Sequence, residues 1–297
     1  MAFVLLFVIS TVLLKGKVPI EPVSLAFPTR LQREKLQKEL AMAMQVQQGL
    51  LDCSVPEIEG IVIAKRFVPA TSVGGDFFGF IEARKGLQEV GDTVGVHRLS
   101  DQKQGQLGVV VGDVSGHGLS SALIMALSSG IIDEIGKRHL EPAKVLEHAN
   151  KDLCRYIAGT EVSHVSAIYA LLDRSALSLD LSRAGHTPLY LLRKEMSEVS
   201  VFELKGVFLG LFETVEFEQK KIALQVGDRL VFFTDGLIES RNPKGELFGE
   251  DRFKDLLLEL KDHPVGHALD RIFDELILFR EGQEQRDDCS VVMIDIV

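Results

Sequence analysis

Apolar and polar positions follow two different periods along this chain, and the change of period divides it into blocks. Between 119 and 157 the apolar residues favour two helices, one over 119–138 and one that starts near Pro142. After Gly159, short apolar runs between turn residues predict strands at 162–172, 176–183, 189–192, 199–204, 217–224 and 229–234. The pattern is completed by a strand at 59–67, helices at 251–260 and 265–279, and a strand at 289–297.

The order of these blocks indicates the fold class. No helix is predicted between 162 and 234, so neighbouring strands in this block are expected to pair antiparallel. Helices on either side of the block are expected to cover the outer faces of two packed sheets. The pattern predicts an α+β fold, an αββα sandwich of two mainly antiparallel sheets flanked by helices, within one domain over 53–297. Residues 82–106 lack a strong period and predict a hairpin with an exposed loop.

The first 28 residues differ from the rest of the chain. Residues 2–14 are apolar and uncharged, and Lys15 and Lys17 follow them. This run is shorter than the ~20 residues of a full membrane span, and it lacks the basic leader of a signal peptide. Two interpretations stay open: the end of a transmembrane helix from a longer protein, and a short anchor. Both lysines favour a cytoplasmic location for the chain after them, at the inner face of the cell membrane.

A linker helix is predicted over 29–52, with Thr29 as its N-cap. Its heptad-spaced positions are Leu36, Leu40, Ala43, Gln47 and Leu50. A two-stranded coiled coil would make this helix the interface of a homodimer. An amphipathic helix that packs on its own domain explains the same spacing, and the short run of heptads leaves both interpretations open.

Composition argues against several classes of function. The 297-residue chain carries a net charge of −10 and a pI near 5.4, so no basic face for nucleic acid is expected. Its 3 cysteines, Cys53, Cys154 and Cys289, lie far apart in the sequence. Their spacing matches neither a disulfide framework nor a zinc site, which favours a reducing compartment.

Acidic residues recur at the ends of apolar runs. Residues 109–118 read VVVGDVSGHG, which predicts a buried strand, a glycine turn and a helix start, with Asp113 in the turn. Asp76, Asp235 and the adjacent Asp287 and Asp288 occupy similar positions. Any one of them is explained equally well as a turn or cap residue. Several carboxylates at strand ends, with few basic residues around them, are typical of a site for a hard cation.

Four motifs in this order carry a family resemblance. They read PATSVGGDFFGF, VVVGDVSGHGLSSALIMA, LSRAGHTPLYLL with GVFLGLF, and DRLVFFTDGLIESRNPKGELFGEDRF with a terminal RDDCSVVMI. Over residues 37–297 the chain resembles the SpoIIE-like or RsbU-like bacterial branch of the metal-dependent, PPM-type protein serine/threonine phosphatases. The resemblance implies hydrolysis of phosphoserine or phosphothreonine by a water that two divalent ions, Mn²⁺ or Mg²⁺, activate.

The resemblance assigns a role to each acidic turn. It implies that Asp76 bridges both ions, and that Asp113 and the backbone carbonyl of Val114 hold one of them. Asp235 and Asp287 would hold the other ion. No serine or cysteine nucleophile is needed for this chemistry.

Other residues in the motifs have supporting roles by the same resemblance. Asp288 is the alternative to its neighbour as a metal ligand, and His117 is a candidate general acid beside the metal turn. His186 is expected to be a buried histidine that orients a loop. The glycines expected to support the turns are Gly75, Gly116, Gly118 and Gly236. Glu239, Arg241 and Asn242 follow the TDG turn and are expected to fix that turn.

The resemblance also implies a regulatory setting. The substrate would be a phosphorylated STAS-type anti-anti-sigma protein, in a partner-switching pathway to which the linker helix transmits a signal. The sequence departs from the usual pattern at Phe78 and at Cys289 with Ser290, and a phosphate-binding arginine is not found near Thr71. None of these departures removes a metal ligand, so an active enzyme is expected. The alternative is a noncatalytic, membrane-tethered pseudo-phosphatase that binds a phosphorylated partner.

Overall fold

The computed structural model describes residues 30–52, 55–82 and 106–297. The apolar run at 2–14, the linker that follows it and most of the predicted hairpin at 82–106 lie outside these residues. The chain divides into two compact units, residues 1–39 and 40–297. The second unit contains both sheets and every carboxylate predicted to bind metal, so the fold below is that of residues 40–297.

Helices and strands follow the predicted order closely. In chain order they are α2 (Arg30–Leu51), β1 (Ile61–Val68), β2 (Phe77–Glu82), β3 (Gln106–Val114), α3 (Leu119–Gly136), α4 (Pro142–Ile157), β4 (Val165–Asp173), β5 (Ser178–Ala184), β6 (Leu189–Leu192), β7 (Ser200–Phe202), β8 (Gln219–Ala223), β9 (Arg229–Phe233), α5 (Asp235–Ile238), α6 (Glu250–Glu259), α7 (Val265–Arg280) and β10 (Cys289–Ile296).

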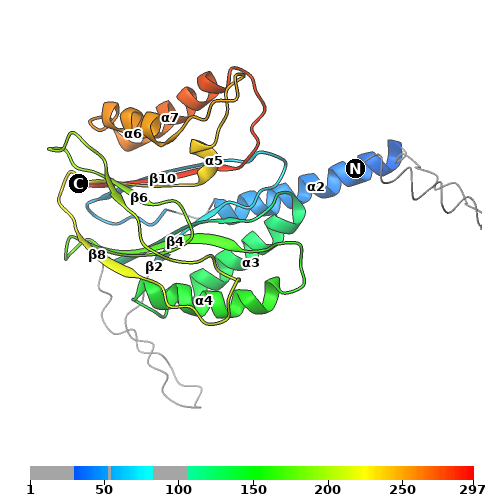
Figure 1. The fold of residues 1–297 in the computed structure, drawn as a ribbon, viewed down its shortest axis with the longest axis horizontal. Helices are drawn as coiled ribbons and strands as arrows, with labels where there is room; N and C mark the ends of the chain where they lie inside the picture. Colours follow the sequence, from blue (N-terminus) through cyan, green and yellow to red (C-terminus); the bar gives the residue numbers. More distant parts are fainter. Residues whose placement is uncertain (1–29, 53–54, 83–105) are drawn as a thin grey trace, which may run out of the picture. The chain divides into compact units, whose positions relative to one another are not determined.

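The strands form two five-stranded sheets. One has the order β1-β10-β9-β6-β7 and the other β2-β3-β4-β5-β8, and all their strand pairs are antiparallel. Helices α6 and α7 lie over the first sheet, and α3 and α4 lie over the second (Figure 1). This arrangement confirms the predicted α+β sandwich.

Apolar side chains fill the layers between these elements. β3 and β4 pair over nine residues, from Gln106 opposite Asp173 to Val114 opposite Val165, and almost every side chain on both strands is buried. On the other sheet, Tyr190 and Phe233 pack against Phe253 of α6, with ring centroids 5.9 and 5.0 Å from it. Burial on both faces explains why these strands read as continuous apolar runs, and it makes their ends rigid supports.

Two elements were absent from the sequence prediction. β2 follows directly after Gly74, Gly75 and Asp76. Its sequence FFGFIE was interpreted as part of a glycine turn, and the structure shows that it pairs with β3. α5 is a single helical turn of four residues, which is too short to produce a helical period. Both elements begin at or next to a predicted metal ligand, where the sequence has the residues of a turn. The sequence therefore predicted turns at these positions and neither element.

One described helix has the length and hydropathy that a membrane span requires. It is α3, and 33% of its apolar window is buried in the fold. Its contacts are with α4, β2 and β3, where Met125 and Ile132 are fully buried. These contacts assign α3 to the packed layer outside the second sheet.

Candidate active site

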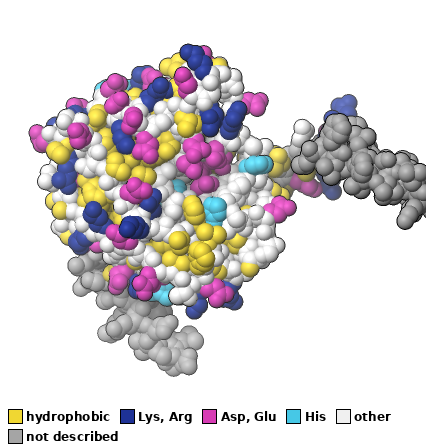
Figure 2. Space-filling view, in the orientation of Figure 1, with side chains coloured by type: hydrophobic (Ala, Val, Ile, Leu, Met, Phe, Trp, Pro, Cys, Tyr) yellow, Lys and Arg dark blue, Asp and Glu magenta, His cyan; other side chains and the backbone are white. Residues whose placement is uncertain are grey.

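The predicted metal ligands lie at strand ends that meet at one end of the two sheets. Asp76 precedes the start of β2, whose first residue pairs with Gly112, so the chain enters β2 beside the end of β3 and Asp113. In the other sheet, β10 begins beside the end of β9, so the segment with Asp287 lies close to Asp235. Figure 2 shows an acidic patch on the surface at the level of α5, the helix that begins with Asp235.

Asp76 is held by two hydroxyl groups. The carboxylate is only 1% exposed, and its Oδ2 accepts hydrogen bonds from Thr234 Oγ1 at 2.7 Å and Ser290 Oγ at 2.8 Å. The N–H of Ser290 donates to the same Thr234 hydroxyl at 2.9 Å, which orients it. Ser290 was one of the predicted departures from the family pattern, and its hydroxyl supplies a hydrogen bond to the candidate bridging ligand.

Asp288 fixes the glycine turn before Asp76. Its Oδ1 accepts from the N–H of Ala70 at 2.8 Å and its Oδ2 from the N–H of Gly75 at 2.7 Å. A Cβ on Gly74 would lie 2.0 Å from Asp288 Oδ2, and one on Gly75 would lie 2.6 Å from the carbonyl oxygen of Val114. Only glycine therefore fits at either position. Both oxygens of Asp288 are occupied by backbone donors, which favours a structural role for it over that of a metal ligand.

Burial, together with the charges of neighbouring carboxylates, raises the pKa of the acidic residues in this cluster. Burial raises the pKa of Asp113 to about 7, and the charges of Asp235, Asp287 and Asp288 add to this effect. The pKa of Asp287 is raised by burial and then by Asp235 and Asp288. Burial, followed by the charges of Asp113 and Asp288, raises the pKa of Asp76 well above its ordinary value. Four acidic segments thus meet where their negative charges destabilise one another.

This donor set fits a divalent cation. Carboxylate oxygens and the carbonyl of Val114, which faces Gly75, are the ligands that hard cations prefer. In the described part of the chain, no three His, Cys, Asp or Glu side chains are drawn together closely enough to form a metal centre as they stand.

His117 lies at the rim of this cluster. It is exposed in the turn after β3, and a positive charge on it would lower the pKa of Asp287. Gly116 and Gly118 on either side have φ values of 93° and 86°, a conformation that favours glycine. The turn therefore presents His117 to solvent beside the carboxylates, and its catalytic role stays a prediction.

His186 belongs to a different, buried environment. Its ring is 4% exposed, its Nδ1 shares a hydrogen bond with Ser166 Oγ at 2.7 Å, and burial lowers its pKa to about 3. The next residue, Thr187, donates its hydroxyl to the carbonyl of Phe233, directly before Thr234. His186 therefore lies in a buried loop that is tied to the end of β9.

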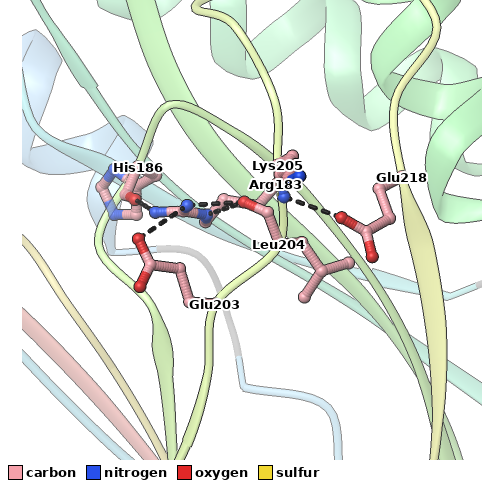
Figure 3. Close-up of polar contacts among 6 residues, drawn as sticks. All are labelled: Arg183, His186, Glu203, Leu204, Lys205 and Glu218. Atoms are coloured by element: carbon pink, nitrogen blue, oxygen red, sulfur yellow. Dashed lines mark hydrogen bonds and ion pairs between the residues drawn. The ribbon is translucent and has the colours of Figure 1, made fainter.

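Arg183 organises the loop around His186 (Figure 3). Its guanidinium donates to the carbonyl oxygens of Leu204 and His186 and to Glu203 Oε1 at 3.3 Å. The N–H of Lys205 in turn donates to Glu218 Oε2 at 2.8 Å. The cation is thus surrounded by acceptors, and it joins the end of β5 to the segment after β7.

A cavity of about 300 Å³ adjoins the carboxylate cluster. It shares Gly236 and Asp287 with the cluster, and three arginines, Arg241, Arg280 and Arg286, line it. Asn242 holds the turn beside it, since its side chain bonds Glu246 and accepts from two backbone N–H groups. Arg241 also donates to the carbonyl of Gly245. These side-chain bonds hold the turn at 241–246, and the role predicted for both residues at the TDG turn stays a prediction.

Three residues of the site were not predicted from the sequence. Thr234 is the first residue of the TDG motif, and Ser290 is the second residue after RDD, so their places near the predicted ligands were the only signal for their hydrogen bonds to Asp76. Gln47 of α2 bonds Gly74 through both ends of its carboxamide, at 2.7 and 3.0 Å. A glutamine at a heptad position gave no indication of this contact.

Comparison with known proteins identifies related sequences. The family described as Stage II sporulation protein E (SpoIIE) matches residues 103–297. Phosphoserine phosphatase RsbU of Bacillus subtilis is 24% identical over 262 residues, which cover 88% of this chain and 71% of RsbU. Phosphoserine phosphatase RsbP of the same organism is 23% identical over 261 residues, which cover 87% of this chain and 58% of RsbP.

Solved structures share the fold. The SiaA-PP2C domain of Pseudomonas aeruginosa superposes with a TM-score of 0.71 at 23% sequence identity. The match covers 89% of this chain and 98% of that domain. The two-sheet sandwich is thus that of PP2C-type phosphatase domains.

Proposed function

The chain belongs to the SpoIIE family of serine phosphatases, and from this premise we propose that it hydrolyses phosphoserine or phosphothreonine on a protein with the help of two divalent metal ions. The observation that carries the proposal is the cluster of carboxylates whose pKa values are raised first by burial and then by one another's charges. A buried group of like charges is costly unless a counter-ion compensates it. Metal dependence is also a general property of PP2C-type phosphatases.

The proposed ligand assignment follows the family resemblance. Asp76 would contact both ions, Asp113 and the carbonyl of Val114 one of them, and Asp235 and Asp287 the other. Oxygen ligands suit Mn²⁺ and Mg²⁺. When bound, the ions supply positive charge to the phosphate oxygens and lower the pKa of a water so that it can attack phosphorus.

The protein's own groups orient the ligands and handle the proton. Thr234 and Ser290 hold one oxygen of Asp76, which leaves Oδ1 free of hydrogen bonds to these two groups. His117, exposed at the rim beside Asp287, is the candidate donor of a proton to the departing serine or threonine oxygen.

The substrate we propose is a phosphorylated STAS-domain protein in a partner-switching pathway. RsbU and RsbP are named phosphoserine phosphatases, which supports phosphoserine as the group that is hydrolysed. The cavity beside Asp287 offers the guanidinium donors of Arg241, Arg280 and Arg286 to the peptide that flanks the phosphorylated residue.

The surrounding chain completes the proposal. Residues 53–297 would be the phosphatase domain, residues 29–52 a regulatory linker helix that makes a homodimer, and residues 1–28 an apolar segment with its linker. The enzyme would act in the cytoplasm, held at the inner face of the membrane by residues 2–14. The alternative is a pseudo-phosphatase that binds a phosphoprotein without hydrolysis, and the presence of all four predicted metal-binding aspartates argues against it.

Hydrolysis of p-nitrophenyl phosphate with and without Mn²⁺ tests the proposal. We expect turnover that depends on Mn²⁺ and is lost in Asp235→Asn, while Asp274→Asn on the exposed face of α7 keeps it. Turnover of a phosphoserine peptide and not of a cyclic dinucleotide would assign the substrate class. A protein that binds Mn²⁺ in calorimetry and hydrolyses neither substrate would instead be the pseudo-phosphatase.

A further inference from the structure

Gln47 is a buried polar residue on a helix whose neighbouring side chains face solvent. It is 5% exposed, whereas Val46 and Leu50 are 66% and 47% exposed. Leu51, one helical turn later on the same face, is buried in the core, and the carbonyl of Leu51 accepts from Lys65 Nζ at 2.8 Å. The end of α2 is thus anchored to β1, and this anchor sets the position of Gln47.

The carboxamide of Gln47 bonds both polar backbone groups of one residue. Its Nε2 donates to the carbonyl oxygen of Gly74 at 2.7 Å, and the N–H of Gly74 donates to its Oε1 at 3.0 Å. One side chain therefore satisfies a buried donor and a buried acceptor that are 27 residues away in sequence. The carboxamide carries its donor and its acceptor on one carbon, so the two can pair with the C=O and the N–H of a single residue.

Gly74 is the first residue of the turn that leads to Asp76. The next N–H, of Gly75, donates to Asp288 at 2.7 Å, and the carbonyl of Gly75 accepts from the N–H of Val114 at 3.3 Å. Asp288 also lies against the bare Cα of Gly74. The turn is therefore held between α2 on one side and the chain before β10 on the other, and Gln47 is its contact with α2.

We propose that Gln47 is a positioning residue for the metal-binding turn. By fixing Gly74 it sets where Gly75 meets Val114 and where the Asp76 carboxylate points, and so it controls metal affinity without touching metal or substrate. This inference rests on the proposed function, because it concerns the same carboxylates. It assigns to α2 a direct, residue-level link with the candidate active site.

The test compares two substitutions with one matched control. Gln47→Met keeps the side-chain length and helix preference but loses both hydrogen bonds, and Gln47→Glu keeps the acceptor for the Gly74 N–H while losing the donor. Gln48→Ala alters the adjacent, exposed position of the same helix. Mn²⁺ affinity is measured by calorimetry, and the Mn²⁺ dependence, kcat and KM are measured with p-nitrophenyl phosphate.

We expect Gln47→Met to bind Mn²⁺ about 10- to 100-fold more weakly, the range for residues that orient metal ligands. KM at saturating Mn²⁺ should stay unchanged, Gln47→Glu should lie between Gln47→Met and the wild type, and Gln48→Ala should match the wild type. Equal Mn²⁺ affinity in Gln47→Met and the wild type would overturn the inference. So would unfolding of metal-free Gln47→Met at 25 °C, because Gln47 would then support the whole fold.

Failure of this inference can be distinguished from failure of the proposed function. If the wild type binds no Mn²⁺ in calorimetry, the metal site itself is wrong and both proposals fall. If the wild type shows Mn²⁺-dependent hydrolysis and Gln47→Met is identical to it, only the role of Gln47 is refuted.

Discussion

Two groups of buried charge, the carboxylates around Asp76 and the cluster around Arg183, are built in opposite ways. The guanidinium of Arg183 is 13% exposed and is surrounded by carbonyl oxygens and by Glu203. Burial raises the pKa of the carboxylates around Asp76, and the charges of neighbouring carboxylates raise it further. A buried charge that is satisfied within the protein stabilises its surroundings, whereas an uncompensated group of like charges needs a partner from outside.

The comparison separates structural from functional burial. Both groups lie near strand ends, and both contain residues from motifs that identify the family. Membership of a motif therefore does not distinguish a structural group from a functional one. The distinction comes from whether the buried charges of the group are compensated within the protein. Substitutions in the two groups should consequently change stability in opposite directions.

The largest effect is expected from Asp113→Asn. Removing one of the mutually repelling carboxylates should lower Mn²⁺-dependent hydrolysis by at least ~100-fold, beyond the usual effect of residues that only orient ligands. The metal-free protein should become more stable by about 1–2 kcal/mol, because the charge whose pKa is raised by burial and repulsion is gone. Hydrolysis assays and urea denaturation in EDTA measure the two quantities. A metal-free variant less stable than the wild type would contradict the comparison.

Arg183→Ala should show the reverse pattern. The substitution leaves the carbonyls of Leu204 and His186 without their donor, which should cost about 2–4 kcal/mol of unfolding free energy. Mn²⁺ affinity by calorimetry should change by less than ~3-fold, since Arg183 bonds none of the carboxylates of the cluster. Arg271→Ala, which removes an exposed i,i+4 ion pair on α7, is the control and should cost under about 0.5 kcal/mol. A large loss of metal affinity in Arg183→Ala would contradict the comparison, because it would show that Arg183 also supports the carboxylates of the cluster.

The pH dependence of stability sharpens the comparison on the Arg183 side. Burial lowers the pKa of His186 to about 3, so below its ordinary pKa of 6.5 the unfolded chain binds a proton that the folded protein does not. The stability that His186 contributes as a neutral group is therefore fully present above pH 6.5, and it is lost as the pH falls toward 3. Between pH 7 and 5 the loss should reach about 2 kcal/mol. Urea denaturation of wild type and His186→Gln at both pH values measures it, and the variant should lose correspondingly less.

The smallest effect is expected at the cavity beside Asp287. Arg286→Ala should raise KM for a phosphoserine peptide about 3- to 10-fold and leave KM for p-nitrophenyl phosphate unchanged, because the small substrate does not reach the flanking cavity. Steady-state kinetics with both substrates decide it. Equal shifts for the two substrates would place Arg286 at the phosphate itself.

Local patterns predicted most of the fold. Apolar runs such as 109–114 are buried on both faces, so the same property that makes them visible in the sequence makes them central strands. The αββα sandwich followed from the order of these runs. β2 was missed for two reasons. It begins directly after a glycine turn, and residues 83–105 separate it in the sequence from β3, the strand with which it pairs.

Ligand candidates could be predicted because carboxylates at strand ends have a clear pattern. Their supports could not, because they depend on contacts across the fold. Asp288 accepts hydrogen bonds from Ala70 and Gly75, which are more than 200 residues away in the sequence. Gln47 bonds Gly74 from helix α2. In the sequence Asp288 is one of two equivalent acids and Gln47 one polar heptad position. Only the folded backbone distinguishes them from their neighbours.

The position of β10 has a consequence for how the protein is made. This strand lies between β1 and β9, and its pairing partner β1 emerges from the ribosome more than 200 residues earlier. Until residue 296 has been synthesised, β1 lacks its partner in the sheet and Asp287 has no fixed place opposite Asp235. Nascent chains therefore leave the edge of β9 unpaired until β10 is made, and the candidate site is completed only when β10 joins the sheet.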